Sequence, residues 1–411
     1  MQSRRVVVTG LGTINPLGNS VDKTWKNLCE GKSGISHVES FNTENIASKI
    51  AGQVKDFDVN EYIDRKKARR MDPYCHYALA SSIQAMNNAN LISIDPEKTG
   101  VITGSGIGGM QTFEKQTETF IKKGPRRVSP FFIPMMISNI MAGIIAIHFN
   151  AKGINFNITS ACASSANAIG EAYRAIKFGN VDVMISSGAE ASITPLTFAG
   201  FSIMRALSIR NDSPETASRP FDLERDGFVL SEGAATIVLE EYEHALKRSA
   251  KIYAEMVGYG ATCDAYHVTM PAQGGEGGAL AMKNALQDAG IQPEDIQYIN
   301  AHGTSTPLND KCETSAIRTV FGDHADKLKI NSSKSMIGHT LGGAGAIESM
   351  ILIKSIKEQK IHPTINLTTP DPECDLDYNP DETIPLKIEY GLTNSFGFGG
   401  HNAVLIFKRY V

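Results

Sequence analysis

Cys162 is the residue of this chain whose type and position most clearly suggest chemistry. The preceding segment 154–158 alternates apolar and polar residues as a strand does, and residues 169–176 carry apolar side chains at helical spacing. The thiol therefore lies where a strand gives way to a helix, whose first N–H groups and positive dipole end favour a thiolate. We expect this position to lower the thiol pKa, and the small neighbouring residues to leave the sulfur accessible. The alternative is an inert buried cysteine, which is the usual state of a free thiol.

Two histidines stand in similar settings. His302 follows the predicted strand 296–300, and His339 lies in a Gly-His-Thr turn. Either one alone would more often be structural. Together with the cysteine they suggest covalent catalysis, with a thiolate nucleophile and two neutral N–H donors for an oxyanion or enolate. The glycine turn NSFGFGG at 394–400 could add backbone amides to an oxyanion hole and aromatic rings that close a pocket.

The elements that must position these residues alternate between strands and helices. The predicted strands are 5–9, 101–103, 181–186, 235–239, 254–258 and 296–300, and the predicted helices are 21–30, 241–248 and 278–289. Residues 10–12 are predicted to form a turn. The segment 328–348 repeats the strand, turn and small-residue helix of 154–177 at an offset of 178, which sets Cys162 within one residue of His339. This repeat predicts an α/β fold of two duplicated halves with two helix N-termini facing one pocket.

The composition is typical of a globular protein. The chain has 411 residues, of which 42% are hydrophobic and 20% charged, and its net charge of −4 gives no reason to expect nucleic acid as a partner. Its six cysteines are scattered singly, which favours a reducing compartment and argues against a zinc site or a disulfide framework. The N-terminus runs directly into a predicted strand, so we expect no signal peptide. Polar residues interrupt the apolar stretch 131–149, which predicts a buried or subunit-interface helix rather than a membrane span, in a cytoplasmic protein.

Two further segments leave alternatives open. Basic residues gather at 65–70 and again at 122–127, where they form either a solvated face or a docking site for an acidic partner. The docking candidates are Arg65, Lys66, Lys67, Arg69, Arg70, Arg126 and Arg127. The sequence GSGIGG at 104–109 matches the G-x-G-x-x-G pattern of dinucleotide sites, but no acidic residue closes a following strand. We therefore interpret it as a glycine turn that passes close to a bound group.

At four motifs the chain resembles the β-ketoacyl-acyl-carrier-protein synthases, most closely the elongating type II enzymes of fatty-acid synthesis. These motifs are SACASS around Cys162, NAHGTSTP around His302, KSMIGH ending at His339, and NSFGFGG at 394–400. The resemblance extends over nearly the whole chain, through VVVTGLG at 6–12, RPFDLERDGFVL at 219–230 and GYGATCDAYH at 258–267. It implies the thiolase fold, a five-layered αβαβα sandwich of two duplicated halves, which we place at 1–250 and 251–411. It also implies a homodimer.

The resemblance further implies the reaction. Cys162 would take an acyl group from acyl carrier protein as a thioester, with the amides of Cys162 and Phe398 holding the oxyanion. His302 and His339 would bind the carbonyl of malonyl carrier protein and stabilise the enolate left when carbon dioxide departs. That carbanion would attack the acyl group and release a 3-oxoacyl chain that is two carbons longer. This chemistry needs no metal and no organic cofactor.

Other residues take roles only through the resemblance. Lys334 would order the histidines with Glu348 as its buried partner, although a purely structural ion pair explains the two nearly as well. Phe398 would gate access of the second substrate. Thr304 and Thr306 would bind the pantetheine arm. The acyl tunnel, unless these residues are ordinary core, would be lined by Ile107, Phe201 and Ile133 of the partner subunit.

Three departures from the family pattern bear on these expectations. His401 replaces a threonine beyond the glycine turn, which puts the hydrogen bonding there in question. Ser231-Glu232 replaces a Gly-Asp pair without an expected consequence for the chemistry. Met135 and Met136 are bulkier than the residues expected at the dimer helix, and they could shorten the acyl tunnel.

Four alternative functions differ at particular residues. A degradative thiolase would carry a second cysteine in the C-terminal glycine turn, where this chain has Phe398. An initiating synthase would pair its cysteine with one histidine and an asparagine. A chain-length-factor-like partner subunit would lack the nucleophile. A free-standing polyketide ketosynthase shares all the residues above, so it remains the open alternative.

Overall fold

The computed structural model describes residues 3–91, 93–380 and 382–411. The strands of its main sheet are β1 (Val6–Ile14), β4 (Thr99–Gly104), β5 (Asn155–Ile158), β6 (Val183–Glu190), β7 (Gly233–Glu241), β8 (Ala254–Cys263), β9 (Tyr298–Asn300), β10 (Lys329–Asn331), β13 (Tyr390–Gly397) and β14 (His401–Arg409). Two small sheets pair β2 (Ile35–His37) with β3 (Ile50–Gly52), and β11 (Lys360–Ile361) with β12 (Ile384–Pro385).

The helices alternate with these strands along the chain. They are α1 (Val21–Cys29), α2 (Arg65–Ala68), α3 (Pro73–Asn88), α4 (Met110–Lys123), α5 (Phe132–Met136), α6 (Ile140–Phe149), α7 (Ser164–Lys177), α8 (Pro195–Ile203), α9 (Tyr242–Lys247), α10 (Glu276–Ala289), α11 (Pro307–Phe321), α12 (Lys334–Ile337) and α13 (Ala344–Glu358). Short 3₁₀ turns precede α7 and α13, and both turns belong to the candidate site.

The sheet consists of two halves with the same topology. In the first half the strand order is β5-β4-β6-β7-β1, and in the second it is β10-β9-β13-β14-β8. In each half the first three strands run parallel and the last two pair antiparallel to their neighbours. The halves join where Val6–Val8 of β1 pair with Ala254–Met256 of β8. The strand order therefore confirms the duplication that the sequence predicted.

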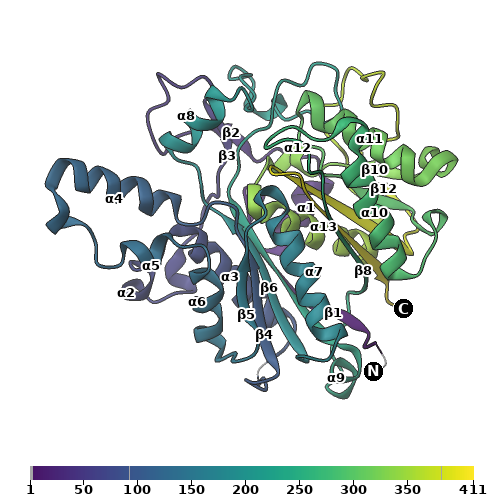
Figure 1. Cartoon of the computed structure of the whole chain (residues 1–411), viewed down its shortest axis with the longest axis horizontal. Helices are drawn as coiled ribbons and strands as arrows, with labels where there is room; N and C mark the ends of the chain where they lie inside the picture. Colours follow the sequence, from purple (N-terminus) through teal and green to yellow (C-terminus); the bar gives the residue numbers. More distant parts are fainter. Residues whose placement is uncertain (1–2, 92, 381) are drawn as a thin grey trace.

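Five layers follow one another through the molecule (Figure 1). Helices α3 and α6 cover the outer face of the first half-sheet, and α10 with α11 cover the outer face of the second. Helix α7 packs on β4 and β6 and also reaches β8 and β14, while α13 packs on β13 and also reaches β6 and β7. The two helices therefore lie between the half-sheets, which gives the αβαβα sandwich of the thiolase fold that we expected.

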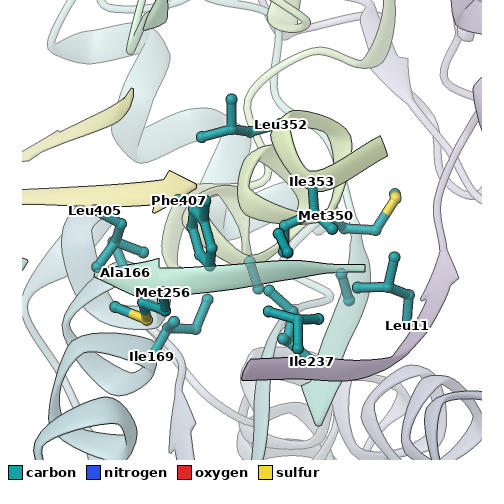
Figure 2. Close-up of a cluster of buried hydrophobic side chains, with 14 of the residues drawn as sticks. Leu11, Ala166, Ile169, Ile237, Met256, Met350, Leu352, Ile353, Leu405 and Phe407 are labelled. Atoms are coloured by element: carbon teal, nitrogen blue, oxygen red, sulfur yellow. The ribbon is translucent and has the colours of Figure 1, made fainter. Parts of the chain in front are cut away.

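The central layer is apolar because it has no face toward solvent. Nearly every residue of α13 is buried, as the sequence of a helix enclosed on all sides requires. Figure 2 shows the packing there: Ala166 and Ile169 of α7 and Met350 and Ile353 of α13 meet strand residues of both halves, such as Phe407. The core thus holds the N-termini of α7 and α13 in fixed positions.

The predicted turn at Gly10-Leu11-Gly12 is wrong, because β1 continues through it to Ile14. A Cβ on Gly10 would lie 2.2 Å from the backbone oxygen of Ala85, and one on Gly12 would lie 2.0 Å from that of Ser81. These glycines let α3 pack directly on the strand. Close helix–strand contact explains them, not a change of chain direction.

The apolar stretch 131–149 forms two helices, α5 and α6, rather than one. Its residues are only partly buried in the single chain: Ile133 is 54% exposed and Ile147 is 82% exposed. In the described part of the chain, no helix has the length and apolar character needed to cross a membrane.

Candidate active site

Cys162 lies in the 3₁₀ turn Ala161–Ala163 between β5 and α7. Ala161 adopts a left-handed conformation with φ 50°, which a non-glycine residue takes only where the surrounding structure imposes it. A Cβ on Gly397 would lie 3.0 Å from the Cys162 nitrogen, so the C-terminal glycine turn packs directly against this amide. The sharp turn places the thiol at the entrance of the helix, as the sequence predicted.

His302 follows β9 on a loop that a buried carboxylate fixes. The backbone N–H groups of His302 and Gly303 donate to the two carboxylate oxygens of Glu313 on α11, each over 2.8 Å. Asn394 of β13 donates to the same carboxylate over 2.9 Å. Helix α11 and strand β13 therefore set the position of the imidazole.

His339 follows α12 after Gly338, whose φ of 79° suits glycine. Its backbone N–H donates to the Val229 oxygen over 2.8 Å. The Leu341 N–H donates to Nδ1 of the ring over 3.3 Å. Since Nδ1 accepts this bond, the neutral ring carries its proton on Nε2.

Lys334 stands behind both histidines. Its Nζ forms a buried ion pair with Glu348 of α13 and donates to the His302 oxygen over 2.7 Å. It also lies 3.4 Å from Nδ1 of His302. An ammonium can only donate, so Nδ1 of His302 is an acceptor and Nε2 again carries the proton. Both imidazoles thus offer an Nε2–H donor.

The histidines are neutral because the site is dry and positively charged. Burial, followed by the charge of Lys334, holds the pKa of both His302 and His339 well below the usual value. Their ring centroids are 5.3 Å apart, at an interplanar angle of 85°. Two neutral donors at this spacing are suited to one developing negative charge on a substrate oxygen.

The thiol is also neutral, which corrects our expectation of a lowered pKa. Burial raises the pKa of Cys162 to about 12, against the opposing effects of Lys334 and the Phe398 amide. The thiol is only 8% exposed, and desolvation of the thiolate outweighs the helix N-terminus. Burial raises the pKa of Glu348 as well, to about 7.

A cavity of about 380 Å³ brings the predicted residues together. Cys162, His302, His339 and Phe398 line it, and so do Thr304 and Thr306. The two threonine hydroxyls are hydrogen-bonded to each other over 2.9 Å. Phe201 also lines the cavity, and its ring stacks edge-on against Phe228, with centroids 5.3 Å apart.

The other predicted acyl-tunnel residues lie outside this cavity. Ile107 lines a second hollow with Phe113, Met136 and Ile137. Met136 is one of the two methionines that depart from the family pattern. Ile133 is exposed on α5. His401 begins β14, is exposed, and packs against Gly399 of the glycine turn.

The basic residues proposed for docking are exposed on α2 and on the 3₁₀ turn that follows α4. Arg70 lies over the ring of Phe131 at 4.6 Å, which brings the first cluster next to the segment after the second. Among the described residues, none of the seven candidates forms an ion pair with a neighbouring carboxylate, so their charges face solvent.

The sequence analysis did not identify two buried carboxylates that hold the site. Glu313 anchors the His302 loop, and Glu190 accepts hydrogen bonds from the amides of the GSGIGG loop. That loop does bind an anion, but the anion is part of the chain. One signal was available for Glu190, because it ends a strand whose other residues are all uncharged. No cluster of three or more potential metal ligands occurs within residues 3–91, 93–380 and 382–411.

Comparison with known proteins adds a second line of support. The family model described as "Beta-ketoacyl synthase, N-terminal domain" matches residues 3–245, and "Beta-ketoacyl synthase, C-terminal domain" matches residues 253–368. The chain is 51% identical to 3-oxoacyl-(acyl-carrier-protein) synthase 2 of Synechocystis sp., over 100% of this chain and 99% of the relative.

Two solved structures share the whole fold. One is a β-ketoacyl synthase from Burkholderia phymatum, with a TM-score of 0.93 and 37% identity over 99% of this chain and 100% of that one. The other is a type II PKS acyl-carrier protein in complex with its ketosynthase bound to the hexaketide. It matches with a TM-score of 0.92 and 38% identity over 100% of both chains.

Proposed function

The chain belongs to the β-ketoacyl synthase family, and on that premise we propose how its residues divide the work of a 3-oxoacyl-(acyl-carrier-protein) synthase. Such an enzyme elongates a fatty acid by condensing an acyl group with malonyl-acyl carrier protein. The observation that carries the proposal is the meeting in one cavity of the Cys162 thiol with two neutral histidines that present Nε2–H groups.

In the first half-reaction Cys162 accepts the acyl group. Its sulfur attacks the thioester carbonyl of the acyl carrier protein, and the amides of Cys162 and Phe398 bind the oxyanion that forms. The carrier thiol leaves with the proton of the Cys162 thiol, which is protonated at rest because burial raises its pKa to about 12. The acyl chain then extends from the cavity floor toward the hollow at Ile107.

In the second half-reaction the histidines hold the malonyl thioester. The Nε2–H groups of His302 and His339 donate to its carbonyl oxygen and stabilise the enolate as the carbon–carbon bond to carbon dioxide breaks. The enolate carbon attacks the acyl group on Cys162, the sulfur leaves, and a 3-oxoacyl carrier protein is released. Lys334, with Glu348, keeps Nδ1 of His302 unprotonated and both rings neutral. No metal or organic cofactor takes part in these steps.

Thr304 and Thr306 would bind the pantetheine arm that delivers both substrates. This role is supported by their position, since both line the cavity together with His302, just before α11. Phe398 lies in the glycine turn and lines the cavity together with Cys162, where its ring would control access of the second substrate.

The carrier protein is the proposed partner of the two basic clusters. Their seven uncompensated positive charges form a surface that would attract an acidic protein and orient it before contact. Reversing two charges in Lys66→Glu with Arg69→Glu should therefore raise KM for acyl carrier protein about tenfold while kcat stays unchanged. Lys283→Glu, an exposed lysine on α10, is the matched control and should leave KM unchanged. If both variants had equal KM values, the basic clusters would be a solvated face without a docking role.

A second copy of the chain is the proposed partner of the α5–α6 face. Strand β5 pairs only with β4, so its other edge is free among the described residues, and Phe156 on it is 43% exposed. Ile133 and Ile147 add exposed apolar surface beside it. A homodimer through this face would cover the edge and bring Ile133 of one subunit toward the hollow at Ile107 of the other. We also propose a cytoplasmic location and a boundary between the two halves at residues 250 and 251.

The test of the proposed function is the intact mass of the protein after incubation with acyl carrier proteins that bear saturated chains of graded length. We expect a mass gain of one acyl group, and no gain in Cys162→Ser. Addition of malonyl carrier protein should then release one product that is two carbons longer. Repeated extension on one chain would instead favour the polyketide ketosynthase, and no adduct with any chain would contradict the proposed nucleophile.

A further inference from the structure

Glu190 is a buried carboxylate without an assigned role. It ends β6, is 0% exposed, and receives hydrogen bonds from two separate segments. Its Oε2 accepts from the amides of Gly106 over 2.8 Å and Gly342 over 3.1 Å. Its Oε1 accepts from the amides of Ile107 and Gly108, each over 3.2 Å. Its partners in the described structure are amides and hydroxyls rather than a cation.

The glycines around this carboxylate leave no room for side chains. A Cβ on Gly106 would lie 3.1 Å from Oε2 of Glu190. A Cβ on Gly342 would lie 2.8 Å from the same oxygen and 2.1 Å from the Gly106 nitrogen. The 105–108 loop and the 341–343 turn therefore touch each other, and both close over one carboxylate. Successive backbone N–H groups that converge in this way form an anion-binding concavity.

Each of these segments leads directly to a residue of the proposed mechanism. The 341–343 turn begins with Leu341, whose N–H fixes the tautomer of His339. The 105–108 loop carries Ile107, which lines the second hollow. The hydroxyl of Thr159 donates to the Ser105 oxygen over 3.0 Å, three positions before Cys162. One carboxylate thus connects three parts of the site that come from distant positions in the sequence.

We propose that Glu190 is a positioning residue for the condensation. It fixes the 105–108 loop, the His339 turn and the Cys162 turn relative to one another. The inference rests on the proposed function, because it assigns those three segments to acyl binding, decarboxylation and acyl transfer. Glu190 touches no reacting atom and acts through the amides it holds. Both of its oxygens are required as acceptors, since all four backbone amides that face it are donors.

The variant Glu190→Gln tests this role with nearly unchanged shape. Its NH₂ group would face the amides of Gly106 and Gly342, so donor would meet donor and the two segments would separate. We expect kcat for condensation to fall about 10²-fold, because a displacement of about 1 Å in a reacting group has that effect. KM for malonyl carrier protein should change less than kcat, since Thr304, Thr306 and the basic clusters are not involved. The ratio of adduct formation with a long and a short acyl chain should also change, because Ile107 moves.

Glu232→Gln is the matched control. Glu232 is likewise buried and has its pKa raised by burial to about 7, but its carboxylate bonds to the Val54 amide, over 3.1 Å, and to Tyr77, rather than to the amides of the site segments. It should lose similar thermal stability and keep kcat and the chain-length ratio. Ser105→Ala, which removes one hydroxyl donor to Glu190, should shift the chain-length ratio in the same direction by a smaller amount.

The outcomes separate this inference from the proposed function. If wild-type protein forms the acyl adduct but Glu190→Gln keeps the wild-type kcat and chain-length ratio, the positioning role is wrong and the function stands. Equal loss of kcat in Glu232→Gln would also overturn it, since any buried carboxylate would then serve. Should Glu190→Gln fail to fold, an unchanged ratio in Ser105→Ala would overturn it. Absence of any adduct on wild-type protein would contradict the function itself.

Discussion

The turns that precede α7 and α13 have the same backbone conformation but different roles at the site. Each is a 3₁₀ turn of three residues, 161–163 in the first half and 341–343 in the second. Each begins with a left-handed residue that is not glycine, Ala161 at φ 50° and Leu341 at φ 45°. The middle residue is Cys162 in one turn and Gly342 in the other. Both turns lie at the N-terminus of a helix in the central layer.

The middle residue gives the first turn a proposed chemical role and the second turn a structural one. Helix N-termini attract negative charge, and a duplicated fold supplies two of them at one site. At α13 the absence of a side chain on Gly342 lets its amide reach the carboxylate of Glu190, so the acceptor at that helix end belongs to the chain itself. At α7 Cys162 lines the cavity, and in the proposed reaction this helix end would bind the oxyanion. One helix end therefore binds a carboxylate of the chain, and the other is proposed to bind the substrate.

Gly342→Ala is the strongest test of this comparison, because it gives the second turn a side chain. The new Cβ would lie 2.1 Å from the Gly106 nitrogen, and neither backbone segment can rotate away. We expect the free energy of unfolding to fall by about 1–3 kcal/mol, as overpacking of a core does. Denaturant unfolding of the two proteins measures it.

Gly200→Ala is the control for that experiment. Gly200 lies in α8, and a Cβ there meets nothing within 4 Å. The substitution should raise stability by about 0.4–1 kcal/mol, since alanine restricts the unfolded chain. If Gly342→Ala behaved like Gly200→Ala, the close contact between the 341–343 turn and the 105–108 loop would not exist in solution.

The same comparison shows which features of the fold could be predicted from sequence. Periodicity located most strands and helices, because alternation and helical spacing depend only on neighbouring residues. It also detected the repeat, but at an offset of 178. The structural offset is 180, from 161 to 341, so Cys162 is equivalent to Gly342 and not to His339. Small residues repeat in both helices, and a shift of two positions still aligns many of them.

The glycine motifs were harder to interpret, because a glycine has no side chain to indicate its purpose. Gly10 and Gly12 look like a turn in sequence, yet they allow α3 to pack on β1. The GSGIGG loop was expected to pass close to a bound group, but in the fold its amides hold Glu190 of the same chain, 82 or more positions later. Contacts between residues so distant in sequence leave no local pattern.

The candidate site was predicted by residue type and by resemblance rather than by local pattern. Cys162, His302 and His339 do meet in one cavity, together with Phe398 and the two threonines. Their protonation was not predictable in the same way. The helix N-terminus suggested that Cys162 would be a thiolate. Burial raises its pKa and keeps it a thiol, and the burial of a single residue is not evident from sequence.

The last prediction concerns the charge of Lys334, which influences both Cys162 in the first turn and His339 just before the second. This cation lowers the pKa of the Cys162 thiol, because it favours a thiolate, and it lowers the pKa of His302 and His339, because it disfavours an imidazolium. Lys334→Met should therefore raise all three pKa values.

Alkylation of Cys162 by iodoacetamide should slow about tenfold for each unit by which the thiol pKa rises. Decarboxylation of malonyl carrier protein, measured in a Cys162→Gln background, should begin to decline at a higher pH in the Lys334→Met variant, because its histidines protonate more readily once the Lys334 charge is gone. The site that keeps Lys334 should decline only at a lower pH. Lys354→Met removes a different buried lysine, which lies on α13 and pairs with Glu358 over 2.6 Å, and should change neither profile. A variant with slower alkylation but an unchanged acid limb would mean that burial alone keeps the histidines neutral, and that Lys334 acts only on the nucleophile of the first turn.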